Sequence, residues 1–200
     1  MIKKFFIDVG HGGSTGAYYD NIHEDDLNLG IALQFRRILL EYSDMITNDP
    51  NRDYTQFEFV IDRLTDKKMD YMKDRVDFAN KYGAEALVSI HANASPSNVN
   101  AKGFNIFYFD GSPRSKILAY CLEARLKMSN KVPFMQAVHT DKDTAIGGIG
   151  VLRFTKMPAA LVEMGFMTNE PDLIKMQDSQ FQLDVARAIF YGTTDFLSIK

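Results

Sequence analysis

Short apolar segments alternate along this chain with long stretches in which apolar residues recur every three or four positions. The apolar segments, which predict strands, span residues 5–9, 57–61, 86–90, 103–109 and 159–162. The stretches between them, which predict helices, span residues 24–42, 68–82, 114–128 and 180–197. Strands that alternate with helices of this length are typical of an α/β domain. We therefore expect a mostly parallel, twisted sheet flanked by helices on both faces.

The first predicted helix shows the helical spacing most clearly. Its apolar face is formed by residues at intervals of four, four, three and four: Leu27, Ile31, Phe35, Ile38 and Tyr42. Asp, Asn and Pro cluster after it, so we expect residues 43–56 to form a polar loop. Gly83 follows the second predicted helix and is a plausible C-cap residue.

Composition limits the classes of protein that this chain can belong to. Its 200 residues are 46% hydrophobic, enough for one domain that buries about 70% of its unfolded surface. The net charge of -3 gives no basic excess of the kind that marks a nucleic-acid binder. A single cysteine, Cys121, excludes a disulfide framework and a cysteine-type zinc site. A metal site in this chain must therefore use histidine and carboxylate.

The N-terminus carries no recognisable export signal. Lys3 and Lys4 precede an apolar run, but Asp8 interrupts it, and no segment approaches the roughly 20 apolar residues of a membrane span. We expect a cytoplasmic protein, a protein released by another route, or a catalytic domain cut from a longer polypeptide, without membrane insertion.

Three polar residues follow predicted strands. His11 comes after the first strand in a glycine-rich loop, His91 follows the strand at 86–90, and Glu163 closes the strand at 159–162. In open parallel sheets, ligand sites lie beyond the carboxyl ends of the strands. We therefore expect these three side chains, remote in sequence, to share one edge of the sheet.

Each of these residues, and Glu24, also has an ordinary structural explanation. A single histidine after a strand is more often structural than a ligand. Glu24 lies three residues after Asn21, in a capping-box pattern, and an acidic residue suits the start of a helix. Glu163 follows apolar residues, where a carboxylate is costly unless it is paired, protonated or functional, so a salt bridge is its alternative role.

Other polar and glycine residues give weaker indications. His23 and His139 have no such placement and are predicted to lie on the surface. Cys121 falls within a predicted helix, where a small buried apolar role is expected. The glycines at 147, 148 and 150 lack the Lys-Ser/Thr ending of a phosphate-binding loop and predict a flexible loop.

The chain resembles the zinc-dependent N-acetylmuramoyl-L-alanine amidases of bacterial autolysins, sporulation hydrolases and phage endolysins. The resemblance covers nearly all 200 residues and rests on motifs in the family's order. These motifs are residues 8–13 (DVGHGG), 24–29 (EDDLNL), Arg63 with Asp66, Arg75, 79–80 (AN), 89–93 (SIHAN), Pro158, 161–166 (LVEMGF) and Asn169. Two departures are Val9, where the family commonly has proline, and the longer segment at 43–56.

The resemblance implies that His11, Glu24 and His91 bind one zinc ion and that Glu163 is the catalytic glutamate. The implied reaction is hydrolysis of the amide between N-acetylmuramic acid and the L-alanine of the peptidoglycan stem peptide. It further implies one catalytic domain over residues 1–200, without an evident wall-binding domain, that works as a monomer at the bacterial cell wall. A phage endolysin or a mother-cell lytic enzyme needs no signal peptide for this.

Two other functions stay open from the sequence. The first is a zinc hydrolase that cleaves a different amide, such as a peptide bond within the stem. The second is a non-catalytic wall-binding homologue, which would be expected to lack a ligand or the glutamate, whereas all four residues are present here.

Overall fold

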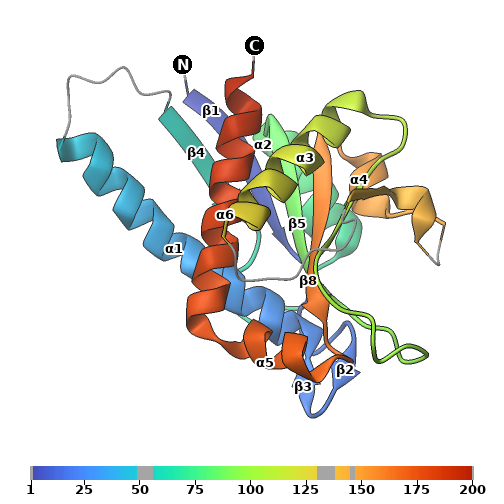
Figure 1. Cartoon of the computed structure of the whole chain (residues 1–200). Helices are drawn as coiled ribbons and strands as arrows, with labels where there is room; N and C mark the ends of the chain where they lie inside the picture. The colour runs from blue at the N-terminus through green and yellow to red at the C-terminus, as the bar shows by residue number, and fades with distance from the viewer. Residues whose placement is uncertain (1, 49–55, 130–137, 145–146, 200) are drawn as a thin grey trace.

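A six-stranded sheet forms the centre of the computed structural model, which describes residues 2–48, 56–129, 138–144 and 147–199 (Figure 1). The strand order is β4-β1-β5-β8-β6-β7. The strands are β1 (Ile2–Val9), β4 (Gln56–Ile61), β5 (Ala86–Asn93), β6 (Asn105–Tyr108), β7 (Val138–Thr140) and β8 (Ala159–Phe166). Neighbours pair in parallel except β6, which is antiparallel to β8. The expected mostly parallel sheet is confirmed, with a reversed edge formed by β6 and β7.

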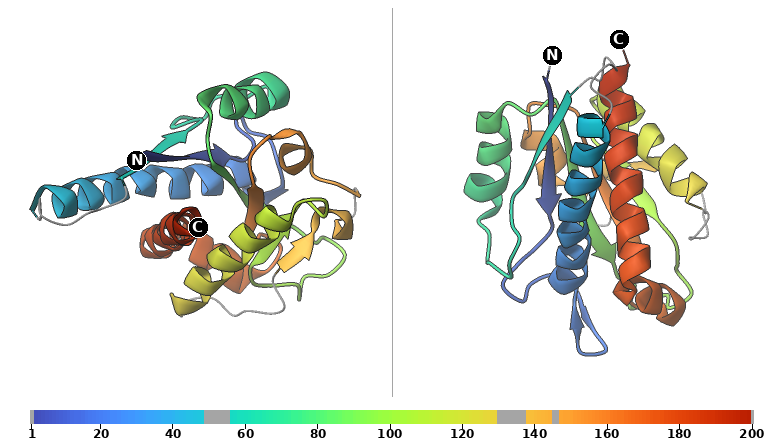
Figure 2. Two further views of the ribbon diagram at one scale, coloured as in Figure 1. Left: turned by 90° about the horizontal axis from the view of Figure 1, so that it is seen from above. Right: turned by 90° about the vertical axis from the view of Figure 1, so that its left-hand side faces the viewer.

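Helices cover both faces of this sheet, as predicted. One face carries α1 (Glu24–Asn48), α3 (Pro113–Met128), α5 (Glu170–Gln177) and α6 (Ser179–Ser198). The other carries the π-helical turn η1 (Tyr71–Asp77) with α2 (Phe78–Tyr82), and α4 (Gly150–Phe154). Figure 2 shows the sheet between these two layers. Two smaller elements are the hairpin of β2 (Tyr18–Tyr19) and β3 (Ile22–His23), and the 3-10 turn η2 (Asp141–Asp143).

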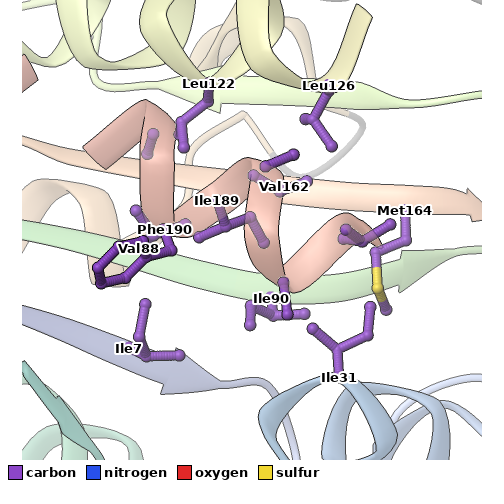
Figure 3. Close-up of a cluster of buried hydrophobic side chains, with 14 of the residues drawn as sticks. Ile7, Ile31, Val88, Ile90, Leu122, Leu126, Val162, Met164, Ile189 and Phe190 are labelled. Atoms are coloured by element: carbon purple, nitrogen blue, oxygen red, sulfur yellow. The ribbon is translucent and has the colours of Figure 1, made fainter. Parts of the chain in front are cut away.

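The larger part of the core lies between the sheet and the long helices. Alternate strand residues point to this side, among them Ile7, Val88, Ile90 and Val162, and they pack against α6 and α3 (Figure 3). The intervening residues of the same strands point to the other face, where Phe6, Leu87 and Leu161 form a smaller cluster. Because the side chains of a strand alternate between two faces, each strand contributes to both cores.

The smaller face changes character along its strands. Toward the carboxyl ends, the residues that continue this face are Asp8, Ser89, His91 and Glu163 instead of apolar side chains. Asp8 pairs with Ser89, and His91 pairs with Glu163. The period of two therefore places four polar groups side by side on the face that carries the fewest helices.

Several element boundaries differ from the sequence predictions. α1 continues to Asn48, so the predicted loop is wrong for residues 43–48, while residues 49–55 lie outside the described part of the chain. The second predicted helix begins only at Tyr71, and Gly83 ends it in the left-handed conformation (φ 73°), as expected of a C-cap. β5 and β8 run past His91 and Glu163, which are strand residues in the structure. These strands continue because neighbouring strands supply their hydrogen bonds, a tertiary effect.

α5 is absent from the sequence predictions. Asn169 caps it by accepting a hydrogen bond from the backbone N–H of Asp172. Its eight residues are too few for a clear helical period.

Among the described residues, no helix is long and apolar enough to span a membrane.

Candidate metal centre and active-site cleft

His11, Glu24 and His91 lie together at the carboxyl ends of β1 and β5. One ligand atom from each side chain lies within 4.8 Å of the others. The Glu24 carboxylate sits between the two rings, with Oε2 3.1 Å from Nε2 of His11 and Oε1 2.8 Å from Nδ1 of His91. In the part of the chain that the structure describes, this is the one cluster of three or more His, Cys, Asp or Glu side chains that could hold a metal ion.

The three side chains are positioned by different kinds of structure. His91 lies on β5, between β1 and β8 in the middle of the sheet. His11 lies two residues after the end of β1 and has a positive φ of 63°. Glu24 is the first residue of α1, directly after the β2–β3 hairpin, and its backbone N–H donates to the carbonyl of Ala17. The start of the helix therefore projects Glu24 toward the strand ends.

The capping-box explanation for Glu24 does not match the structure. Asn21 lies with Asp20 in the turn of the hairpin, where both have a positive φ, and its side chain accepts a hydrogen bond from the Tyr18 hydroxyl. The Glu24 carboxylate accepts from the backbone N–H groups of Ala17 and Ala92 as well as contacting the two histidines. Its side chain thus points into the cluster, and both of its oxygens have partners there.

Two glycines leave room for the cluster. A Cβ atom on Gly10 would lie 2.5 Å from both Cε1 and Nε2 of His91. On Gly16, whose φ is 93°, a Cβ would lie 2.8 Å from Oε2 of Glu24 and from the His11 ring. A side chain at either position would displace a candidate ligand.

The charges of the cluster favour an ionised carboxylate. Burial raises the pKa of Glu24, but the hydrogen bonds with His11 and His91 outweigh it and hold the pKa well below its usual value. Burial lowers the pKa of His91, and the contact with Glu24 reverses this, so the net shift is upward. Glu24 is therefore charged at neutral pH, as a carboxylate ligand must be.

The donor set fits a zinc ion. Zinc binds two imidazole nitrogens and a carboxylate oxygen in many catalytic sites, which leaves a fourth position open. Ligand atoms about 2.1 Å from a tetrahedral ion lie roughly 3.4 Å apart. The separations of 3.1 and 2.8 Å between the Glu24 oxygens and the two histidines are close to this distance. Small adjustments of the side chains would bring all three to one ion.

Glu163 lies beside this cluster, on the strand next to His91. The two residues are register partners in β5 and β8. Burial, together with the nearby charge of Glu24, raises the pKa of Glu163 to about 7, although His91 opposes the shift. Its Oε2 atom is buried and accepts no hydrogen bond from the residues that the structure describes. A carboxyl group of this kind changes its protonation state near neutral pH, as a general base or acid must.

A cleft of about 890 Å³ opens over these residues. His11, His91 and Glu163 line this cleft, together with residues near the starts of η1 and α4. Lys68, Met69 and Tyr71 come from the start of η1 and the residues before it, and Thr144, Ile149, Gly150 and Val151 come from the start of α4 and the residues before it. The volume is that of a typical small-molecule or peptide site.

The chain matches the family model described as N-acetylmuramoyl-L-alanine amidase over residues 5–195. It belongs to this amidase family. Among the relatives of this amidase-family chain, the N-acetylmuramoyl-L-alanine amidase CwlM of Bacillus licheniformis is 33% identical over 187 residues, covering 92% of this chain and 64% of the relative. An uncharacterised cell wall amidase of Bacillus anthracis is 29% identical over 205 residues, covering 99% of this chain and 36% of the relative. The chain therefore spans less than two thirds of the length of either relative.

The fold of the amidase-family chain also matches solved structures. The crystal structure of an N-acetylmuramoyl-L-alanine amidase from Clostridium difficile 630 superposes with a TM-score of 0.82 at 29% identity. The match covers 99% of this chain and 98% of the other. The likeness thus includes the whole α/β domain, with its sheet and both helical layers.

Two buried arginines near the cluster, Arg63 and Arg75, have no role in the sequence predictions for this amidase-family chain. Arg75 forms ion pairs with Asp8 and, at 3.1 Å, with Asp62, and it donates to the carbonyls of Val9 and His11. Arg63 donates to the carbonyls of Val9 and Gly10 at 3.0 and 2.8 Å. The sequence showed both only as motif residues, because the backbone carbonyls to which they donate, at the end of β1 and just after it, lie more than 50 positions away.

The remaining single-residue predictions have mixed outcomes. His23 and His139 are half-buried, with the Tyr18 ring 4.5 Å from His23 and the Asn105 side chain 3.1 Å from His139. Cys121 lies in α3, as expected, but is half-buried. Gly150 begins α4, so the predicted flexible loop is wrong at this position.

Proposed function

We propose that the chain is a zinc-dependent peptidoglycan hydrolase that cleaves the amide between N-acetylmuramic acid and the L-alanine of the stem peptide. The observation that carries the proposal is the cluster of His11, Glu24 and His91 beside Glu163, on the floor of one cleft. Membership of the N-acetylmuramoyl-L-alanine amidase family supports this choice of bond.

His11, Glu24 and His91 would hold one zinc ion in this proposal. When bound, zinc supplies Lewis-acid chemistry, which polarises a carbonyl group and makes water acidic near neutral pH. Glu24 contributes a negative charge to the ligand set, and the two histidines contribute ring nitrogens. The hydrogen bonds of Glu24 to the backbone N–H groups of Ala17 and Ala92 hold its carboxylate in place.

Glu163 would act as the general base. In its ionised form it takes a proton from the attacking water, and in its protonated form it passes that proton to the leaving amine. Two features support this role: Glu163 lines the same cleft as His11 and His91, and its pKa is about 7. The salt-bridge alternative is not supported, because Oε2 has no partner in the described chain.

The direct test is digestion of purified peptidoglycan, with and without a chelator, followed by mass spectrometry of the products. We expect free stem peptides that begin at L-alanine, lost on chelation and restored by added zinc. Zinc-dependent cleavage at another amide would keep the metal site but overturn the proposed bond. Zinc binding without any cleavage would favour a non-catalytic wall-binding protein.

The proposed substrate also places the protein at the bacterial cell wall, and we propose that it acts there as a monomer, through the single catalytic domain at 1–200. Light scattering of the purified protein tests the oligomeric state. A mass of twice the 22.7 kDa of the chain would contradict it.

A further inference from the structure

The three candidate ligands differ in how far strand pairing fixes the backbone of the segment that carries them. His91 is fixed by ladders on both sides, since β5 pairs with β1 and with β8. His11 lies beyond the end of β1, and Glu24 begins a helix that packs over the sheet. The separation between His11 and Glu24 therefore depends on contacts outside the ladders.

The loop that carries His11 has a conformation that local sequence does not favour. Four consecutive residues, His11 to Ser14, have positive φ angles of 63°, 129°, 70° and 55°. Glycine tolerates this conformation at two of these positions, but a left-handed residue with a side chain costs about 1–2 kcal/mol. Such strain persists where surrounding contacts fix the backbone.

Arg63 supplies such contacts and extends them to the helix. Its Nε donates to the Val9 carbonyl at 3.0 Å, and its Nη2 donates to the Gly10 carbonyl at 2.8 Å. The same Nη2 donates to the carbonyl of Asp25, 2.9 Å away in the first turn of α1. One guanidinium thus contacts the residue before His11 and the residue after Glu24. Arg63 is only 3% exposed, so water does not compete for these hydrogen bonds.

Arg75 provides a useful comparison because it contacts the His11 loop but, among the described residues, donates no hydrogen bond to α1. It donates to the carbonyls of Val9 and His11, and its charge is met by Asp8 and Asp62. Arg75 therefore supports the His11 loop, and Arg63 connects that loop to the helix.

Two residues of α1 strengthen the same connection. Asn28 donates from its side-chain amide to the Gly10 carbonyl at 3.1 Å. The Asp25 carboxylate accepts from the backbone N–H of Ser14 at 2.8 Å. The Gly10 carbonyl thus accepts from Arg63 and Asn28 together, and loss of either donor leaves the other in place.

We propose that Arg63 is a positioning residue for the metal centre: it sets the separation between the His11 loop and the Glu24 helix turn, and thereby the affinity for zinc. The inference rests on the metal site of the proposed function but does not depend on which bond is cleaved. A planar guanidinium with donors in a fixed fork can reach both segments, whereas a lysine ammonium is a single point charge.

The test compares Arg63→Lys and Arg63→Met with the wild-type chain in zinc affinity, by competition with a chromophoric chelator. We expect both variants to bind zinc about 10–100-fold more weakly, the range found when groups that orient metal ligands are lost. The lysine variant keeps the charge and the aliphatic stem, so it tests the proposal even where the methionine variant fails to fold. The visible spectrum of bound Co²⁺ should change in the lysine variant, since the ligands lose their relative placement.

A matched control is Arg125→Met, which removes an ion pair with Asp195 between α3 and α6. It should lower thermal stability in chelator without changing zinc affinity. Zinc affinity of Arg63→Lys within threefold of wild type, or an equal loss in Arg125→Met, would overturn the positioning role. A wild-type chain that binds no zinc would overturn both proposals, whereas zinc binding without amide cleavage would overturn only the proposed function.

Discussion

Glu163 combines two properties that usually conflict in a folded protein. Its Oε2 atom is buried and has no hydrogen-bond partner among the described residues, which destabilises the fold when the carboxylate is charged, yet the proposed base must be charged to accept a proton. Its pKa of about 7, against an ordinary value of 4.5, means that the folded state binds this proton more tightly than the unfolded state. The stability contributed by the protonated carboxyl group is therefore lost as the pH rises from about 4.5 through about 7.

Glu163→Gln should abolish amide hydrolysis and stabilise the metal-free protein at high pH. The shift corresponds to an upper limit of about 3 kcal/mol in the free energy of unfolding at roughly pH 8, shrinking toward zero below about pH 4.5. Denaturant unfolding of both proteins in chelator, across this range, measures the difference. Equal free energies of unfolding at high pH would show that the charged Glu163 side chain does not destabilise the fold. The metal-free state is required because a nearby cation favours the charged carboxylate.

Gly10→Ala tests whether the metal site depends on the absence of a side chain at position 10. The added Cβ would lie 2.5 Å from two atoms of the His91 ring, so His91 must move. We expect zinc affinity to fall about tenfold or more, as for other disturbed ligand positions. The affinity can be measured by the same chelator competition.

Gly83→Ala is the matched control for this substitution. Gly83 has a positive φ, but no heavy atom of the described residues lies within 4 Å of an added Cβ. The change should cost about 1 kcal/mol of stability through backbone strain and leave zinc affinity unchanged. Similar affinity losses in both variants would mean that general destabilisation, and not contact with His91, is the cause.

At the scale of elements, the cleft depends on how η1 approaches α4. Tyr71, the first residue of η1, reaches across to Gly150, the first residue of α4, where an added Cβ would lie 1.8 Å from the tyrosine hydroxyl. Both residues line the cleft. A side chain at position 150 therefore requires the Tyr71 ring to leave its place in the wall.

Gly150→Ala and Tyr71→Ala should each raise KM on the order of fivefold, about 1 kcal/mol, and the double variant should be no worse than either single one. Both changes act on the position of the same ring, so their effects are not additive. Steady-state kinetics of the four proteins measure this coupling. Strictly additive effects would show that the two residues contribute to the cleft independently.

At the scale of the whole molecule, zinc should stabilise the fold because its ligands come from segments far apart in the chain. An ion that binds only the folded state adds about 4 kcal/mol at a thousandfold excess over its dissociation constant. We expect a higher Tm in zinc than in chelator for the wild-type chain and no difference for His11→Ala. Thermal unfolding under both conditions checks this. A shift retained in His11→Ala would place the zinc elsewhere.

The sequence determined the architecture and the neighbourhood of the site. Alternating strand and helix patterns predicted the sheet with its two helical layers, and the rule for parallel strands brought His11, His91 and Glu163 to one edge. These predictions succeed because hydrophobic periodicity and strand direction are encoded in consecutive residues. Glu24 was ambiguous between cap and ligand, since the first turn of a helix favours acidic residues in either case.

The tertiary structure alone decided how the site is held and how its groups behave. The bonds of Arg63 to Val9 and Gly10 join residues more than 50 positions apart, and the contact of Tyr71 with Gly150 joins still more distant ones. The reversed direction of β6 against β8 and the raised pKa of Glu163 also arise from packing between distant segments. Local patterns record which face of an element is apolar, but distances between segments and burial of single groups are set only when the whole chain has folded.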